Sequence, residues 1–106
     1  MTTRPPAVAG LFYAGDPDLL RTQVLDLLAD FAAPTKVTPK ALVAPHAGYV
    51  YSGRVAAAAF ATLRDSAQAI TRVVLIGPAH YVQVRGFAAP TVDSFEIPLG
   101  RVPRPE

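Results

Sequence analysis

Residues 41–53 read ALVAPHAGYVYSG, and residues 73–81 read VVLIGPAHY. In each stretch a short apolar run leads into a turn that contains proline and then histidine. Apolar runs without alternation are typical of parallel strands that are covered on both faces. His46 and His80 are the two histidines of the chain. Because the carboxyl ends of parallel strands meet at one edge of an open α/β sheet, we expect these histidines to share a site there.

The residues between the two stretches predict a helix from about Arg54 to Arg64, with Ser52 as its cap. A strand, a helix and a second strand over roughly 35 residues form a βαβ unit, whose crossover is right-handed. Small side chains on almost every side of this helix favour close packing on a sheet. Gly48 and Gly53 are expected to bracket a loop that follows the first histidine.

A second helix is predicted upstream, where Asp16 serves as cap and Pro17 suits the first helical position. Apolar residues then recur at helical spacing through Phe31, which indicates a surface helix with one buried face. Pro34 is expected to end this helix. Its carboxyl-terminal neighbours up to Pro39 are expected to form a loop.

The remaining segments give weaker signals. Residues 1–8 are expected to be an irregular lead-in because consecutive prolines prevent regular hydrogen bonding. Residues 82–90 are read as an edge strand, residues 91–100 as extended or looped, and residues 101–106 as lacking order of their own. The fold class is therefore α/β, with a partial parallel or mixed sheet and flanking helices. Since parallel strands normally have both faces covered, the sequence is expected to be a truncated part of a longer domain.

The composition bounds the function. A chain of 106 residues with 51% hydrophobic residues is one small domain or part of one, not a disordered polar tail. No apolar run approaches the ~20 residues that span a bilayer, and residues 1–6 lack a signal-peptide pattern, so no membrane association and a cytoplasmic location are expected. The net charge of +2 comes with scattered arginines, which gives nucleic-acid binding little support. Without cysteine there is no disulfide or thiolate site in this segment.

Several side chains near the histidines are candidates for chemistry. Imidazole is a common transition-metal ligand and also an acid or base near neutral pH. Tyr49 and Tyr51 are candidates for substrate binding, the alternative being that one ring packs and the other is exposed. Ser52 lacks the strand-nucleophile-helix pattern of hydrolases, so capping is favoured over nucleophilic attack. Asp93 and Glu96 are expected to be solvated rather than to reach the histidines.

Four motifs then resemble one family. Residues 8–13 (VAGLFY), 44–53 (APHAGYVYSG), 75–80 (LIGPAH) and 98–100 (PLG) occur in the order and approximate spacing of the amino-terminal part of the Memo family. Prokaryotic members of that family are called AmmeMemoRadiSam system protein B. The resemblance covers nearly the whole chain, and it identifies residues 1–106 as the amino-terminal portion of a single Memo-like α/β domain.

The resemblance implies a fold related to class III extradiol ring-cleaving dioxygenases, which hold non-heme iron with two histidines and a carboxylate. It implies that His46 and His80 are metal ligands, for iron or copper, and that a further histidine and a cysteine of the family lie beyond Glu106. Tyr81 departs from the pattern, since the family often has a second adjacent histidine there. A functional link to a radical SAM protein and an AMMECR-type protein is also implied.

Two readings of function follow. In the first, this is a Memo-like protein whose dioxygenase-like metal pocket has a metal-dependent redox role. In the second, it is a non-catalytic module that binds a protein or peptide in the same pocket. A hydrolase is a distant third.

Overall fold

Helix α1 (Pro17–Ala29) begins where the sequence predicts it. The computed structural model describes residues 1–31 and 37–105, so the predicted stop at Pro34 lies outside the described residues. The Asp16 carboxylate accepts a hydrogen bond from the backbone N–H of Leu19 at 2.9 Å, which satisfies a free donor of the first turn. Leu20 is buried on the inner face of the helix. Helix α1 therefore packs with one face, as its apolar spacing indicates.

Helix α2 (Tyr49–Ala61) begins several residues before the predicted start. Gly48 caps it, and the backbone N–H of Tyr49 donates to the carbonyl of Phe12 at 2.8 Å, so the segment that precedes α1 satisfies a free donor of the first turn of α2. Ser52 lies within the helix and donates its hydroxyl proton to the carbonyl of Ala47 at 2.9 Å. The predictions of Ser52 as cap and of a loop up to Gly53 were therefore wrong.

The two helices pack through small residues of α2. Ala57 and Ala61 are buried, and Gly53 is buried where Leu27 of α1 approaches it. The short helix η1 (Arg64–Ala69) follows, and the guanidinium of Arg64 donates to the carbonyls of Leu28 and Phe31 near the end of α1. These bonds tie η1 to the carboxyl end of α1. None of the helices in the described part of the chain has the length and apolar character that crossing a membrane requires.

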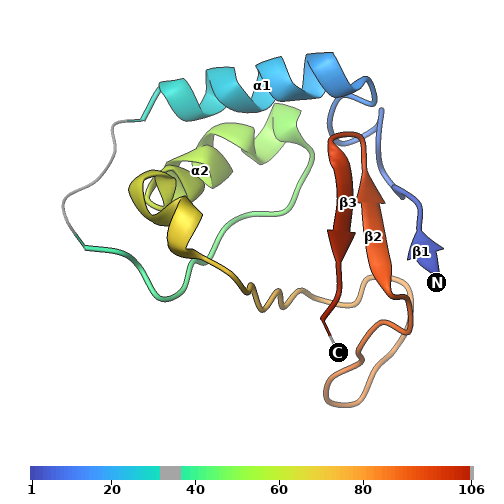
Figure 1. Ribbon diagram of the computed structural model, residues 1–106. Coiled ribbons are helices and arrows are strands. Elements are labelled where there is room, and N and C mark those ends of the chain that lie inside the picture. Colours follow the sequence, from blue (N-terminus) through green and yellow to red (C-terminus); the bar gives the residue numbers. More distant parts are fainter. Residues whose placement is uncertain (32–36, 106) are drawn as a thin grey trace.

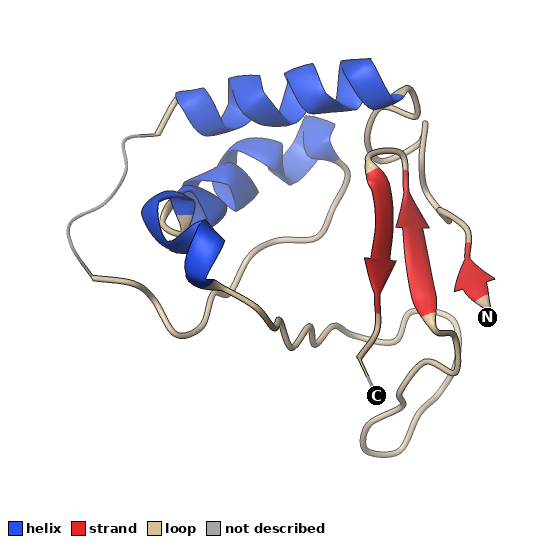
Figure 2. Ribbon diagram, viewed as in Figure 1, coloured by secondary structure: helices blue, strands red, loops and turns tan. Residues whose placement is uncertain are grey.

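A small mixed sheet lies beside the helices (Figures 1 and 2). Its strands are β1 (Thr3–Arg4), β2 (Ser94–Ile97) and β3 (Gly100–Pro103), in the order β1-β2-β3. Strand β1 runs parallel to β2, and β3 returns antiparallel to β2. The expectation of an irregular lead-in was therefore wrong at β1. Local sequence could not reveal this strand because its partner is distant in the chain: Thr3 and Ser94 are 91 residues apart.

The predicted strands at residues 41–44 and 73–76 do not pair. No backbone hydrogen bond joins either run to another described residue outside it, and Val43 and Leu75 are 98% and 91% exposed. The predicted βαβ unit was therefore wrong, as was the edge strand at residues 82–90, which are irregular and exposed. The α/β class with helices and a mixed sheet is confirmed, but the sheet is built from other segments. In Figure 1 the chain after η1 runs from below the helices toward the small sheet without regular structure.

Candidate functional site

The two histidines lie side by side. The ring centroids of His46 and His80 are 5.2 Å apart, and the ring planes are inclined by 45°. Each imidazole follows one of the unpaired apolar runs, His46 after residues 41–44 and His80 after residues 73–76. Both side chains belong to exposed residues. The expected proximity is thus present, although it arises between two loops rather than at the edge of a parallel sheet.

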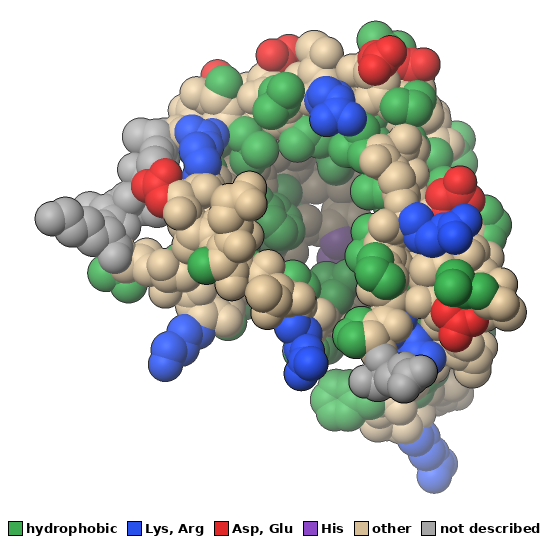
Figure 3. All heavy atoms as spheres, in the orientation of Figure 1, with side chains coloured by type: hydrophobic (Ala, Val, Ile, Leu, Met, Phe, Trp, Pro, Cys, Tyr) green, Lys and Arg blue, Asp and Glu red, His purple; other side chains and the backbone are tan. Residues whose placement is uncertain are grey.

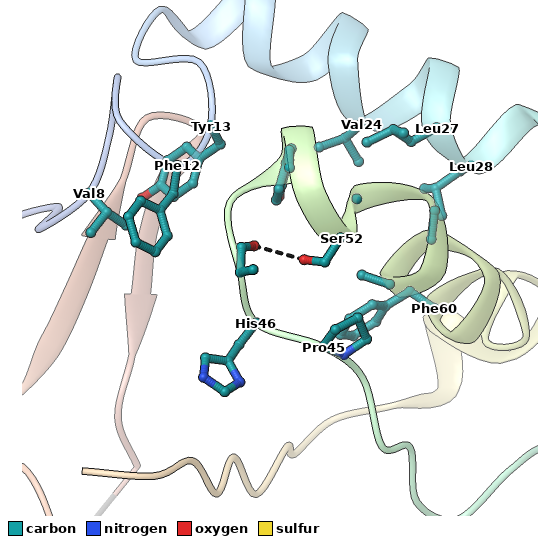
Figure 4. Close-up of a pocket in the computed structure, with 15 residues that line it drawn as sticks. Val8, Phe12, Tyr13, Val24, Leu27, Leu28, Pro45, His46, Ser52 and Phe60 are labelled. Carbon is teal, nitrogen blue, oxygen red and sulfur yellow. Dashed lines mark hydrogen bonds between the residues drawn. The ribbon is translucent and has the colours of Figure 1, made fainter. Parts of the chain in front are cut away.

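His46 borders an apolar hollow. A cavity of about 510 Å³ lies between α1, α2, the loop of residues 8–13 and residues 45–47. In Figure 3 the molecule is hollowed between the helices and the antiparallel strands β2 and β3. A histidine side chain lies at the back of this hollow. Figure 4 shows the close-up, with the His46 ring standing apart from the side chains of α1. Most of the wall is apolar, including Val8, Phe12, Val24, Leu27, Leu28 and Phe60.

The two candidate tyrosines have different surroundings. Tyr49 is half-buried, lines the cavity and lies against Tyr13, with ring centroids 5.8 Å apart. Burial raises the pKa of Tyr49, and the neighbouring phenol of Tyr13 raises it further, so the Tyr49 hydroxyl stays protonated at neutral pH and can donate. Tyr51 is 86% exposed. Side chains two positions apart on a helix point to different sides, which explains why one ring packs and the other does not.

Ser52 also lines the cavity, but its proton is held by the Ala47 carbonyl, the dashed line in Figure 4. No side chain of the described residues bonds it as a base, so the geometry gives a nucleophilic role no support.

Asp93 belongs to the sheet rather than to the histidine pair. Its carboxylate accepts the backbone N–H of Thr2 at 2.6 Å and the Thr2 hydroxyl at 3.0 Å. The bond from the Thr2 backbone is the main cause that holds the pKa of Asp93 below its ordinary value, and the Thr2 hydroxyl adds to it. Glu96 is exposed on β2. Among residues 1–31 and 37–105, no three or more His, Cys, Asp or Glu side chains gather into a metal-binding group.

The aromatic segment of residues 8–13 lines part of the cavity wall, which the sequence did not predict. Phe12 and Tyr13 both line the cavity, and the carbonyl of Phe12 holds the start of α2. The segment turns sharply at Gly10, whose φ of 79° favours glycine, and its ends approach through a bridge between Ala9 and Tyr13. The glycine-flanked aromatic pattern was the signal that could have indicated this role.

Comparison with known proteins gives the family. The sequence model of the Memo family, described as Memo-like protein, matches residues 4–104. The chain belongs to the Memo-like protein family. The Memo-like chain is 38% identical to the MEMO1 family protein of Aquifex aeolicus over 102 residues, which cover 96% of the chain and 36% of that protein.

Two other relatives give the same picture. The chain is 40% identical to the protein memo-1 homolog of Caenorhabditis elegans over 98 residues, which cover 92% of the chain and 27% of that protein. It is 38% identical to the MEMO1 family protein of Archaeoglobus fulgidus over 103 residues, which cover 93% of the chain and 35% of that protein. The Memo-like chain thus spans about a third of the length of the curated relatives it matches.

Proposed function

We propose that His46 and His80 bind one transition-metal ion and that this Memo-like chain contributes a dioxygenase-like metal pocket with a redox role. The observation that carries the proposal is the 5.2 Å separation of the two ring centroids. When two imidazoles share a metal at ~2.1 Å with bond angles of ~90–110°, the ring centroids lie roughly 4.5–5.3 Å apart. The separation of the ring centroids therefore lies within the range for a shared ion.

The donor set bears on the choice of metal. Imidazole ligands suit iron and copper, the metals proposed here, and also zinc and nickel. A bound iron or copper ion would supply redox chemistry at coordination positions that the two imidazoles leave open. Two protein ligands make an incomplete site, so we propose that this chain is the amino-terminal portion of a single Memo-like domain whose further ligands lie outside residues 1–106. The functional link to radical SAM and AMMECR-type proteins belongs to the same proposal.

The chain's own residues would shape the surroundings of the ion. The apolar wall of the cavity beside His46 would exclude water from one side of the site. Tyr49, protonated and half-buried on the same wall, would offer a hydrogen bond to a ligand in the cavity. Tyr51 is retained as a substrate-binding candidate only for a ligand that extends to the outer surface, because its ring is 86% exposed.

A metal titration tests the proposal. The chain is titrated with iron(II) under anaerobic conditions, and separately with copper, alongside His46→Ala, His80→Ala and the double variant. Removing either imidazole should weaken metal binding by at least about 10-fold, since even outer-shell partners of metal ligands are worth that much. Tyr81→Ala is the matched control, because this fully exposed ring follows His80 directly. Equal metal binding by the double variant would contradict the proposal.

The second candidate function is a non-catalytic protein- or peptide-binding module. The mostly apolar cavity of about 510 Å³ favours it, since a side chain from a partner could fill such a space. The same double variant separates the two candidates. Peptide binding that persists without both imidazoles and without metal supports the module, whereas loss of binding together with the metal supports the metal pocket.

A further inference from the structure

The imidazole of His46 depends for its position on the His46 turn, residues 45–48. Among the described residues no hydrogen bond reaches the ring itself, and its aromatic neighbour is His80. Side chains that ligate metals are normally oriented by groups behind them, and the loss of such a group weakens metal binding. The groups that fix the backbone of the His46 turn therefore set where the ring lies.

Phe12 fixes the far end of the His46 turn through its backbone. Its carbonyl accepts the N–H of Tyr49 at 2.8 Å. A Cβ atom at Gly48 would lie 3.4 Å from the Cα of Phe12, so the two backbones approach closely. Because both contacts are made by backbone atoms, a change of the Phe12 side chain does not remove them.

Ser52 restrains the middle of the His46 turn through its side chain. Its hydroxyl donates to the carbonyl of Ala47, the residue that follows His46, at 2.9 Å. Figure 4 shows this bond extending from α2 to the turn. In the described part of the chain the Ala47 carbonyl accepts no other hydrogen bond, and no other side chain bonds to residues 45–48. Replacing the Ser52 hydroxyl therefore removes one defined restraint on the turn.

The serine itself belongs to a packed element. Its backbone N–H donates to the carbonyl of Gly48 at 3.1 Å. The next residue, Gly53, is buried where Leu27 of α1 approaches it. Because sites held by helices are more precise than sites held by loops, the Ser52 hydroxyl transmits the position of the helix pair to the His46 turn.

We infer that Ser52 is a positioning residue, which holds the His46 turn so that the imidazole of His46 lies beside that of His80. The placement of the two rings is a property of the metal-free chain, whereas its consequence for metal binding rests on the proposed function. Alanine at this position lacks the hydroxyl donor, and threonine retains it. In Ser52→Ala the Ala47 carbonyl bonds to water instead, and the turn gains freedom that moves the His46 ring away from His80.

Nuclear magnetic resonance of the metal-free chain tests the placement. The wild type should show a nuclear Overhauser effect between the rings of His46 and His80, whose centroids are 5.2 Å apart. Ser52→Ala should weaken this effect, and Ser52→Thr should restore it. Ser66→Ala is the matched control, because the Ser66 hydroxyl also donates to a backbone carbonyl, that of Leu63 at 3.2 Å, but does not line the cavity.

Metal titration tests the consequence. Ser52→Ala should bind iron(II) or copper roughly 5-fold more weakly than the wild type, which is about the worth of one hydrogen bond. Ser52→Thr and Ser66→Ala should bind these metals as the wild type does. Circular dichroism should be the same for all four chains, because the bond between Ser52 and Ala47 lies at the surface.

An inter-ring effect that persists unchanged in Ser52→Ala would overturn the inference, as would equal weakening in Ser66→Ala. A wild type that shows the effect and its dependence on Ser52 but binds no metal would contradict the proposed function and support the positioning role. A wild type without the effect would overturn the inference whatever its affinity for metal.

Discussion

Tyr49 shows how a single position couples packing to protonation. Its ring fills part of the cavity wall, where water that would solvate a phenolate is partly excluded, and the phenol of Tyr13 adds an unfavourable charge interaction. Both effects favour the neutral hydroxyl. The folded chain therefore holds this proton to a higher pH than the unfolded chain does.

The alkaline stability of the chain should depend on Tyr49. A pKa that is raised on folding contributes stability below the ordinary value of 10.0, and this contribution is lost as the pH rises through the folded value. Above about pH 10 the free energy of unfolding should thus fall more steeply for the wild type than for Tyr49→Phe. Denaturant unfolding at pH 8 and above 10 measures this. Tyr51→Phe, at the 86% exposed neighbour, should behave as wild type, and equal slopes for all three would refute the assignment.

At the residue scale, the sequence predicted that the two histidines lie close together, although the parallel sheet on which that prediction rested is not formed. Two equivalent turn motifs indicated that His46 and His80 would lie together, and they do. The surroundings of Tyr49 could not be derived, because they depend on Phe12 and Tyr13, to which the sequence assigned no place beside the histidines. A contact between distant segments leaves no local periodicity to detect.

Gly53 controls how closely the two helices approach. A Cβ atom placed there would lie 3.2 Å from Cδ1 of Leu27 and 3.3 Å from Cβ of Tyr49. Glycine within a helix costs roughly 0.5–1 kcal/mol relative to alanine, so the close approach offsets a real penalty. The absence of a side chain at Gly53 thus serves packing rather than the loop that the sequence suggested.

Substitution at Gly53 should separate helix propensity from packing. Gly53→Val should destabilise the chain by about 1–3 kcal/mol through overpacking against Leu27, whereas Gly53→Ala should be close to neutral because improved helix propensity offsets the two tight contacts, with Leu27 and Tyr49. Denaturant unfolding measures both. Leu27→Ala combined with Gly53→Val should be less destabilising than the sum of the single changes. Additive effects would show that the two side chains do not meet.

At the scale of elements, local sequence signals predicted where a helix begins better than they predicted which segments pair as strands. Helix α1 was predictable because Asp16, Pro17 and the apolar spacing all specify the same start. Helix α2 was placed too late because two glycines suggested a loop, whereas the Phe12 carbonyl and close packing on Leu27 allow a helix there. Strand assignment failed more broadly, since a strand exists only with a neighbour to pair with. Residues 41–44 and 73–76 have strand-like composition without such a neighbour among the described residues.

The whole molecule is tied together at the sheet by contacts of Thr2 and Thr3. Asp93 accepts two bonds from Thr2, and the hydroxyls of Thr3 and Ser94 lie 2.8 Å apart, with Ser94 only 2% exposed. These bonds join segments 91 residues apart. Protonation of Asp93 would remove the negative charge to which the backbone N–H and the hydroxyl of Thr2 donate.

Acid should therefore release β1 before the helices. A lowered pKa contributes stability above the ordinary value of 3.8, and that stability is lost as the pH falls through the folded value. Amide exchange at residues 2–4 should accelerate below about pH 4, after correction for intrinsic rates, and Asp93→Asn should show faster exchange already at pH 6. Glu96→Gln, whose side chain bonds no other described residue, should leave exchange at residues 2–4 unchanged. Unchanged exchange in Asp93→Asn would exclude the carboxylate as an anchor.

The separation of β1 from β2 also bears on the order in which the chain folds. Closing a loop of about 90 residues costs on the order of 4 kcal/mol of chain entropy before any strand bond is gained. The helices meet over much shorter distances, as the 24-residue separation of Asp30 and Arg54 illustrates. Folding should thus begin with the packing of α1 against α2. Strand β1 should join last, and closure of the long loop between β1 and β2 should limit the folding rate.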